Sequence, residues 1–97
     1  MDDGFGRRRV ALLGRRLPPR FRLRAVAVGP GRALAFDEAE WRDSLVVVER
    51  GELELECLDG SRRCFGRGDV LCLDGLSLRT LRNPGREPAL LLAVSRR

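Results

Sequence analysis

The side chains that most often bind metals or act as nucleophiles are sparse in this sequence. The 97-residue chain contains no histidine and three cysteines, Cys57, Cys64 and Cys72. The cysteines are seven and eight positions apart, so no pair has the C-x-x-C spacing of a zinc site and no histidine completes a ligand set. We therefore expect small, buried or half-buried thiols in a reducing compartment rather than a disulfide or a metal cluster.

The charged residues are distributed unevenly along the chain. All 19 basic residues are arginines, and eight of them lie in residues 1–24 against two aspartates. Residues 25–97 carry eleven arginines against twelve acidic residues and are close to neutral. The basic segment is the one candidate for contacting nucleic acid phosphates. It lacks the interleaved aromatic residues of a stacking surface, so we do not expect nucleic acid as a partner.

Length and hydropathy indicate a single domain without a membrane partner. A chain of 97 residues has room for one hydrophobic core. No apolar run approaches the roughly 20 residues that span a bilayer, and the N-terminus lacks the apolar region of a secretory signal. We expect a cytoplasmic protein with two parts: a flexible basic arm over residues 1–19, ended by Pro18 and Pro19, and a folded domain over residues 20–97.

The folded part has the sequence pattern of an all-β domain. Polar and apolar residues alternate in many short segments, which is typical of half-buried strands, and residues that favour turns separate these segments. In "ELELEC", for example, three glutamates share one face and two leucines and a cysteine share the other. Regularly spaced short strands indicate a sandwich or barrel. The predicted strands span 20–29, 31–36, 44–50, 52–57, 62–65, 70–73, 76–81 and 89–95.

One segment resembles the second motif of the cupin superfamily, which runs G-x5-P-x-G-x2-H-x3-N. Gly68 and Asp69 open it here, and Asn83-Pro84-Gly85 closes it with the family's spacing. The family's proline, glycine and histidine are replaced, by Asp74, Leu76 and Arg79. The resemblance implies a small double-stranded β-helix, a jelly-roll barrel with one open mouth.

A second segment is similar to the family's first motif, G-x5-H-x-H-x3-4-E-x6-G. With Gly51 as its last glycine, Ser44 occupies the glutamate position and Glu40 and Glu38 occupy the two histidine positions. The resemblance therefore implies a ligand-binding site made by Glu38, Glu40, Ser44 and Arg79. If both glutamates lie on a strand and face inward, Trp41 faces outward. Its expected role is packing, with a dimer contact as the alternative.

The residues at these positions argue against the metal that typical cupins hold. Such a metal is bound by three imidazoles and a carboxylate, all of which donate lone pairs. Arg79 has no lone pair to donate and stays protonated. An inward-facing arginine would repel a cation by about 4 kcal/mol per unit charge at about 4 Å and an effective dielectric constant near 20. We therefore expect no metal and no other cofactor.

Three interpretations of these residues remain open. Glu38 and Glu40 could form an internal ion pair with Arg79 that fills the former site, or these residues could simply lie at the surface. Alternatively, Arg79 could bind a carboxylate or phosphate while the glutamates and Ser44 accept or donate hydrogen bonds. The third interpretation is a cupin-type enzyme, an isomerase, epimerase or oxygenase, with Glu38 or Glu40 as general base or metal ligand.

The sequence thus predicts a metal-free cupin-like protein rather than a clear enzyme. Its role would be to bind a small anionic molecule in the barrel or to serve a structural or regulatory function. Short strands leave unpaired sheet edges, which a second chain can cover favourably. Small cupins also often form dimers. We therefore expect a homodimer.

Overall fold

The computed structural model describes residues 20–96 of the chain, and its regular structure consists of eight β-strands and one helical turn among these residues. The predicted all-β fold is confirmed, because each predicted segment overlaps an observed strand. The basic arm predicted for residues 1–19 lies outside the described residues. The elements are β1 (Phe21–Val28), β2 (Ala33–Ala35), α2 (Glu38–Trp41), β3 (Ser44–Arg50), β4 (Glu52–Cys57), β5 (Arg62–Gly66), β6 (Val70–Cys72), β7 (Leu78–Arg82) and β8 (Ala89–Arg96).

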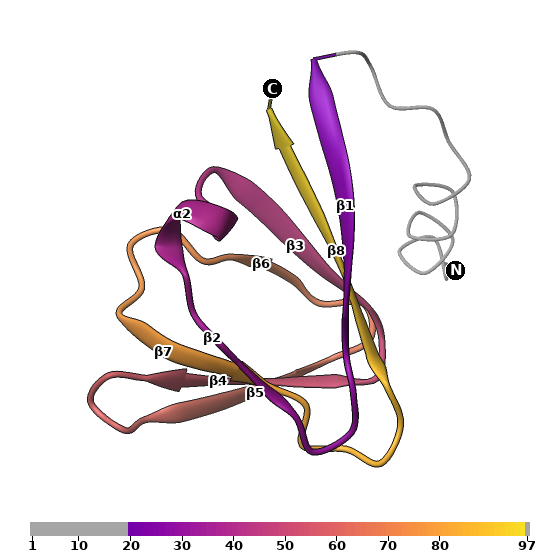
Figure 1. Cartoon of the computed structure of the whole chain (residues 1–97), viewed down its shortest axis with the longest axis vertical. Helices are drawn as coiled ribbons and strands as arrows, with labels where there is room; N and C mark the ends of the chain where they lie inside the picture. Colours follow the sequence, from indigo (N-terminus) through magenta and orange to yellow (C-terminus); the bar gives the residue numbers. More distant parts are fainter. Residues whose placement is uncertain (1–19, 97) are drawn as a thin grey trace.

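The strands form two four-stranded sheets packed face to face (Figure 1). Sheet A has the order β1-β8-β3-β6 and sheet B has the order β2-β7-β4-β5. Every pairing is antiparallel, and most neighbours in a sheet are distant in sequence, such as β1 with β8 and β4 with β7. This connectivity is that of a jelly roll. The predicted double-stranded β-helix is therefore confirmed.

The core lies between the inner faces of the two sheets. Because side chains alternate along a strand, every second residue of each long strand points into this core. Sheet A contributes valines and leucines such as Val46, Val48 and Leu91, and sheet B contributes Leu53, Leu55 and Leu81, all of them buried. Burial of these aliphatic side chains is the main stabilising contribution in so small a domain.

The outer faces of the two sheets differ in polarity. On sheet B the outward-facing glutamates of β4 form ion pairs with neighbouring strands: Glu56 lies 3.8 Å from Arg62 and Glu54 lies 3.6 Å from Arg82. On sheet A the outward-facing positions are apolar over most of the surface. They are Leu23, Ala25, Ala27, Leu45, Val47, Val70, Cys72, Leu90, Leu92 and Val94, of which Val47 and Leu92 are buried.

Asn83 holds the β1–β2 turn and the β7–β8 turn together at one end of the barrel. Its buried amide nitrogen donates to the carbonyl oxygens of Val28 at 2.9 Å and Glu87 at 2.6 Å, and its amide oxygen accepts from the Gly85 N–H at 2.9 Å. A buried amide with all these partners satisfied fixes both turns. The asparagine that closes the family motif thus has a structural role in this chain.

The opposite end of the barrel is covered by α2, a single helical turn (Figure 1). Asp37 caps this turn, since its carboxylate accepts from the Ala39 N–H at 3.1 Å. The turn ends at Arg42, which is extended, and Asp43 follows in the left-handed region with φ of 58°. Glu38 and Glu40 thus lie on a helical turn, so the condition of an inward-facing strand, under which Trp41 would face outward, is not met. α2 buries Trp41 instead, at 2% exposure within the core cluster, so its expected packing role is confirmed.

The remaining expectations on composition have mixed outcomes. All three cysteines are free: Cys57 is half-buried as predicted, whereas Cys64 and Cys72 are exposed, which corrects the expectation of burial. Both exposed thiols lie on outer faces of edge strands, β5 and β6. Within residues 20–96, no helix is both long and apolar enough to cross a membrane.

Candidate functional site

The inner face of sheet A changes from apolar to polar toward the end covered by α2. Deep in the barrel, Val26 of β1 lies opposite Leu91 of β8. Two positions further along, the facing pair is Arg24 and Ala93. Directly opposed residues of antiparallel strands project to the same side. The Arg24 side chain therefore points into the barrel, next to the apolar side chains that lie deeper in it.

The last row of this face is fully polar and spans three strands. Arg22 of β1 lies opposite Ser95 of β8, and Ser95 lies opposite Ser44 of β3. Ser44 is 5% exposed, and its hydroxyl donates to the Arg42 carbonyl oxygen over a long 3.4 Å. A guanidinium and two hydroxyls thus stand side by side at the barrel mouth, and all three can donate hydrogen bonds.

Arg24 is fixed at one side of the mouth by three contacts with α2. Its guanidinium donates to the Glu40 carboxylate at 2.9 Å and to the Glu40 carbonyl oxygen at 3.0 Å. The same group lies over the Trp41 ring, with 4.7 Å between the guanidinium carbon and the ring centroid. A stacked arginine that also forms a charge-assisted pair loses much of its rotational freedom. Arg24 therefore connects α2 to β1.

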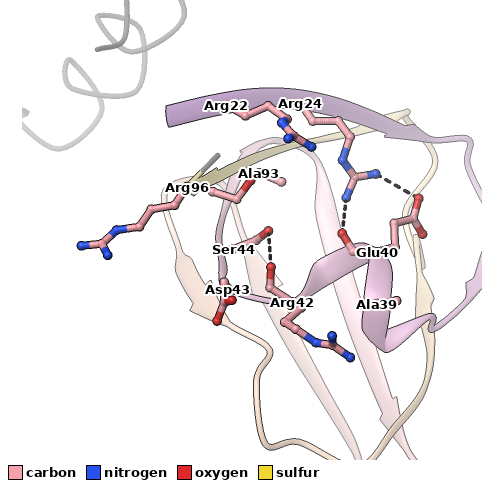
Figure 2. A pocket seen from close by; sticks show the side chains of 10 residues that line it. Arg22, Arg24, Ala39, Glu40, Arg42, Asp43, Ser44, Ala93 and Arg96 are labelled. Atoms are coloured by element: carbon pink, nitrogen blue, oxygen red, sulfur yellow. Dashed lines mark hydrogen bonds and ion pairs between the residues drawn. The ribbon is translucent and has the colours of Figure 1, made fainter. Parts of the chain in front are cut away.

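These residues enclose a pocket of about 200 Å³ between β1, α2 and the ends of β3 and β8. Figure 2 shows Arg22 and Arg24 extending from β1 toward α2 and Ser44. Four arginines and two acidic residues line the pocket, so its formal charge is positive. The lining residues are Arg22, Arg24, Ala39, Glu40, Arg42, Asp43, Ser44, Ala93, Ser95 and Arg96.

Most of this positive charge is not neutralised within the part of the chain that the structure describes. Arg24 is paired with Glu40. Among residues 20–96, no ion pair or hydrogen bond involves the guanidinium groups of Arg22, Arg42 or Arg96. In Figure 2, the side chains of Arg42 and Arg96 extend away from the pocket centre, so that among residues 20–96 Arg22 is the cation without an ion pair that extends toward it.

The four residues implied by the family motifs are not brought together. Glu40 and Ser44 line the mouth pocket, whereas Glu38 is exposed and lines a different depression beside Leu58 and Leu76. Arg79 is also exposed and donates to the Leu58 carbonyl oxygen at 3.1 Å. The internal ion pair of Glu38 and Glu40 with Arg79 is therefore wrong, because Glu40 pairs with Arg24 instead.

A β-bulge explains the position of Arg79. On β4, Glu56 lies opposite Thr80 and the next residue, Cys57, lies opposite Leu78. Arg79 thus has no partner on β4, and a residue in a bulge is displaced from the regular alternation of faces. Its side chain is directed out of the barrel, which removes the motif's histidine position from the interior.

The described residues do not fit the metal site of typical cupins. In residues 20–96, no group of three or more histidine, cysteine, aspartate or glutamate side chains gathers at one point. Of the four positions where the family motif implies ligands, Glu40 has its carboxylate against the Arg24 guanidinium, and Arg79 has no lone pair to donate. Neither group is arranged to donate lone pairs to a shared cation.

Sequence reasoning missed Arg22, Arg24 and Ser95, although the sequence carried signals for them. In "RFRLRAVAV", arginines at positions 22 and 24 are in phase with valines at 26 and 28. The same strand face therefore changes from charged to apolar, which is the pattern of a strand that runs from a polar mouth into a core. Ser95 continues the inward-facing set of β8 after Leu91 and Ala93.

Comparison with solved structures finds the same architecture in several cupins. A cupin-2 conserved barrel domain protein from Salinispora arenicola has a TM-score of 0.64 and 28% sequence identity, over 80% of this chain and 64% of that one. The chain therefore spans less than two thirds of that protein's length. No protein-family model and no curated protein matches the sequence.

Two further structures show the shared fold at lower identity. The cupin-2 domain of an XRE-family transcriptional regulator from Enterobacter cloacae has a TM-score of 0.62 and 24% identity, over 77% of this chain and 79% of that one. A cupin domain from Bordetella pertussis Tohama I has a TM-score of 0.59 and 17% identity, over 84% and 86%. Strand order and these likenesses define a small cupin-type β-barrel. The chain belongs to the cupin superfamily.

Proposed function

We propose that this cupin binds a small anion, a carboxylate or a phosphate, in the pocket at the barrel mouth. The observation that supports this proposal is the row of Arg22, Ser95 and Ser44, which lie opposite one another on three adjacent strands. Arg22 and Ser95 present hydrogen-bond donors to one pocket, and the Ser44 hydroxyl adds a third when it rotates away from its long 3.4 Å contact with the Arg42 carbonyl oxygen. An anion is the ligand that accepts from such a set.

The chemistry of the pocket favours an anion over a cation or a neutral apolar ligand. A guanidinium offers two parallel N–H donors to a carboxylate or phosphate, and the nearby hydroxyls can donate to the remaining lone pairs. Arg24 adds little net charge, because Glu40 neutralises it at 2.9 Å. The volume of about 200 Å³ is below the usual range of drug-sized sites, so the pocket suits a small charged group.

The proposal keeps the ligand class expected from the sequence and changes the arginine that binds it. Arg79 was the predicted anion-binding residue, but its side chain donates to the Leu58 carbonyl oxygen outside the barrel. Arg22 takes that role in the proposal. A general base at Glu38 or Glu40 is less favoured, because Glu38 lies outside the mouth pocket and Glu40 is already paired with Arg24. Binding rather than catalysis is therefore the proposed role.

The test is calorimetric titration of the full chain with acetate and with inorganic phosphate at low ionic strength. We expect Arg22→Gln to weaken binding by about tenfold or more, the usual effect of losing a charge-assisted hydrogen bond. Arg63→Gln is the matched control, because Arg63 is an exposed strand arginine on β5, outside the pocket. Equal losses in both variants would mean that net charge alone governs binding, and the proposed site would be wrong.

The absence of a bound metal stays a prediction and needs its own measurement. Elemental analysis should be made on protein purified without a polyhistidine tag, since the sequence itself has no histidine. We expect no transition metal in stoichiometric amount. A stoichiometric metal would contradict this expectation and return Glu38, Glu40 and the cysteines to consideration as ligands.

A further inference from the structure

A second cavity, of about 730 Å³, lies at the same end of sheet A as the mouth pocket. The two cavities share four lining residues, Asp43, Ser44, Ser95 and Arg96. Ser44 and Asp43 lie where β3 begins, and Ser95 and Arg96 lie where β8 ends. The cavities therefore meet over these strand ends, one on the inner and one on the outer side of the sheet.

The second cavity is lined by apolar side chains from the outer face of sheet A. Leu45 of β3 lies opposite both Val94 of β8 and Cys72 of β6, so these three side chains form one row across the sheet. Phe21 of β1 lines the same cavity. Leu45 is 53% exposed, which is high for a leucine on a regular strand. This surface would gain from contact with an apolar group.

The polar groups of the second cavity are concentrated where it meets the mouth pocket. Arg96 lies opposite Phe21 and therefore projects to the outer side of the sheet, and Figure 2 shows its side chain extending away from the residues of the mouth pocket. The Asp74 carboxylate accepts from the Asp43 N–H at 3.2 and 3.3 Å. Within residues 20–96 no ion pair engages the Arg96 guanidinium, whereas the Asp74 carboxylate is engaged with the backbone.

We propose that the natural ligand is an amphipathic anion with a carboxylate or phosphate head and an aliphatic or aromatic tail. The head lies at the strand ends, between Arg22 on the inner side and Arg96 on the outer side, and accepts from Ser44 and Ser95. The tail lies along Leu45 and its neighbours in the second cavity. This inference rests on the proposed anion binding at the mouth and adds the class of molecule that carries the anion.

A homologous series of straight-chain carboxylates tests the tail separately from the head. Each buried methylene contributes about 0.8 kcal/mol, which is about fourfold in affinity at full burial and about twofold at half burial. We expect the affinity of the full chain to rise from acetate through butyrate and hexanoate to octanoate, by about two- to fourfold per methylene. 1-Octanol, which has the tail without the charge, should bind much more weakly than octanoate.

Leu45→Asn is the informative variant, and Leu58→Asn is its matched control. Leu45 and Leu58 are similarly exposed, at 53% and 58%, but Leu58 lies outside the second cavity. We expect Leu45→Asn to flatten the dependence on chain length while acetate binding is retained. Leu58→Asn should leave both unchanged. Because both leucines are exposed, neither substitution should unfold the barrel, and circular dichroism verifies this.

The remaining outcomes separate the two proposals. Acetate binding with no gain along the series overturns the amphipathic ligand and leaves the anion site standing. Failure of every carboxylate and of phosphate to bind overturns the anion site and the inference that rests on it. Equal binding of 1-octanol and octanoate overturns the role of the head group. A change in oligomeric state in Leu45→Asn, with no chain-length effect in the parent, assigns the apolar surface to a second copy and overturns the inference.

Discussion

The guanidinium of Arg24 lies over the indole ring of Trp41, with 4.7 Å between the guanidinium carbon and the ring centroid. The indole itself is buried in the core, whereas the guanidinium is partly exposed and also pairs with Glu40. One arginine thus links the only tryptophan of the chain to the pocket mouth. Trp41 fluorescence should therefore report both the stability of the barrel and events in the pocket.

We predict that Arg24→Met lowers the free energy of unfolding by about 1–2 kcal/mol. The substitution keeps an unbranched side chain but removes a cation–π contact and a partly exposed ion pair. Urea unfolding followed by Trp41 fluorescence provides the measurement. Arg62→Met is the control, because Arg62 pairs with Glu56 over a longer 3.8 Å on the outside of sheet B, where the loss should stay below about 1 kcal/mol. Equal losses would show that the ring contact adds no stability.

Much of the fold could be predicted from the sequence, because each strand carries its own local signal. The alternation in "ELELEC" and the Asp59-Gly60 turn specify the β4–β5 hairpin without reference to the rest of the chain. The Asn83-Pro84-Gly85 turn does the same between β7 and β8. These patterns act over a few residues, so the chain can be assigned to strands one segment at a time.

The candidate site was predicted less well, because its geometry depends on features that cross strands. A bulge turns Arg79 outward, and it follows from how β4 and β7 pair rather than from either sequence alone. The turn at residues 38–41 had a local signal that was missed: Asp37 followed by Glu40 three positions later has the pattern of a helix N-terminus. Family spacing indicated only that Glu38 and Glu40 occupy the histidine positions, whereas the capping pattern indicates the helical turn that carries them.

A second prediction compares two glycines that share a left-handed backbone but differ in their surroundings. Gly51 has φ of 76° and Gly60 has φ of 90°. A Cβ at Gly51 would lie 2.8 Å from the Pro88 carbonyl oxygen and 2.9 Å from the Ala89 Cα, whereas a Cβ at Gly60 meets nothing within 4 Å. Only the first position therefore combines backbone strain with a clash against another strand.

We predict that Gly60→Ala costs about 1–2 kcal/mol, the usual penalty of a left-handed non-glycine residue. Gly51→Ala should cost about 2 kcal/mol more, because the atoms it contacts belong to the backbone and cannot rotate away. Chemical denaturation of both variants measures the difference. Matching stabilities would mean that the β3–β4 connection shifts away from β8 at little cost.

A third prediction concerns the pH dependence of the Asp59 turn. The Asp59 carboxylate accepts from the Ser61 hydroxyl at 2.7 Å and from the Ser61 N–H at 2.9 Å. These two hydrogen bonds lower the pKa of Asp59 from its ordinary value. A carboxyl whose pKa is lower in the folded state contributes stability above the unfolded value of about 3.9, and this contribution is lost as the pH falls through the folded pKa.

NMR titration of the Asp59 side chain checks this prediction. We expect Ser61→Ala to raise the pKa of Asp59 toward its ordinary value, because the larger of the two stabilising hydrogen bonds is removed. Ser77→Ala, at another exposed turn, should leave the Asp59 titration unchanged. A titration curve that does not move in Ser61→Ala would refute the assigned cause.

The final prediction is that the protein forms a homodimer through the β6 edge of sheet A, at Val70, which does not line the second cavity. Val70 lies on the edge strand β6 and is 47% exposed, a position that would be covered if a second copy packed along this edge. Light scattering at tens of micromolar should therefore give twice the 10.9 kDa mass of one chain.

Val70→Glu should shift the protein to monomer, because it would bury an unpaired charge at the contact. Leu76→Glu is the control, since Leu76 is similarly exposed, at 46%, but lies in the β6–β7 turn. A monomeric parent chain, or equal dissociation in both variants, would contradict the assignment of the contact to this edge.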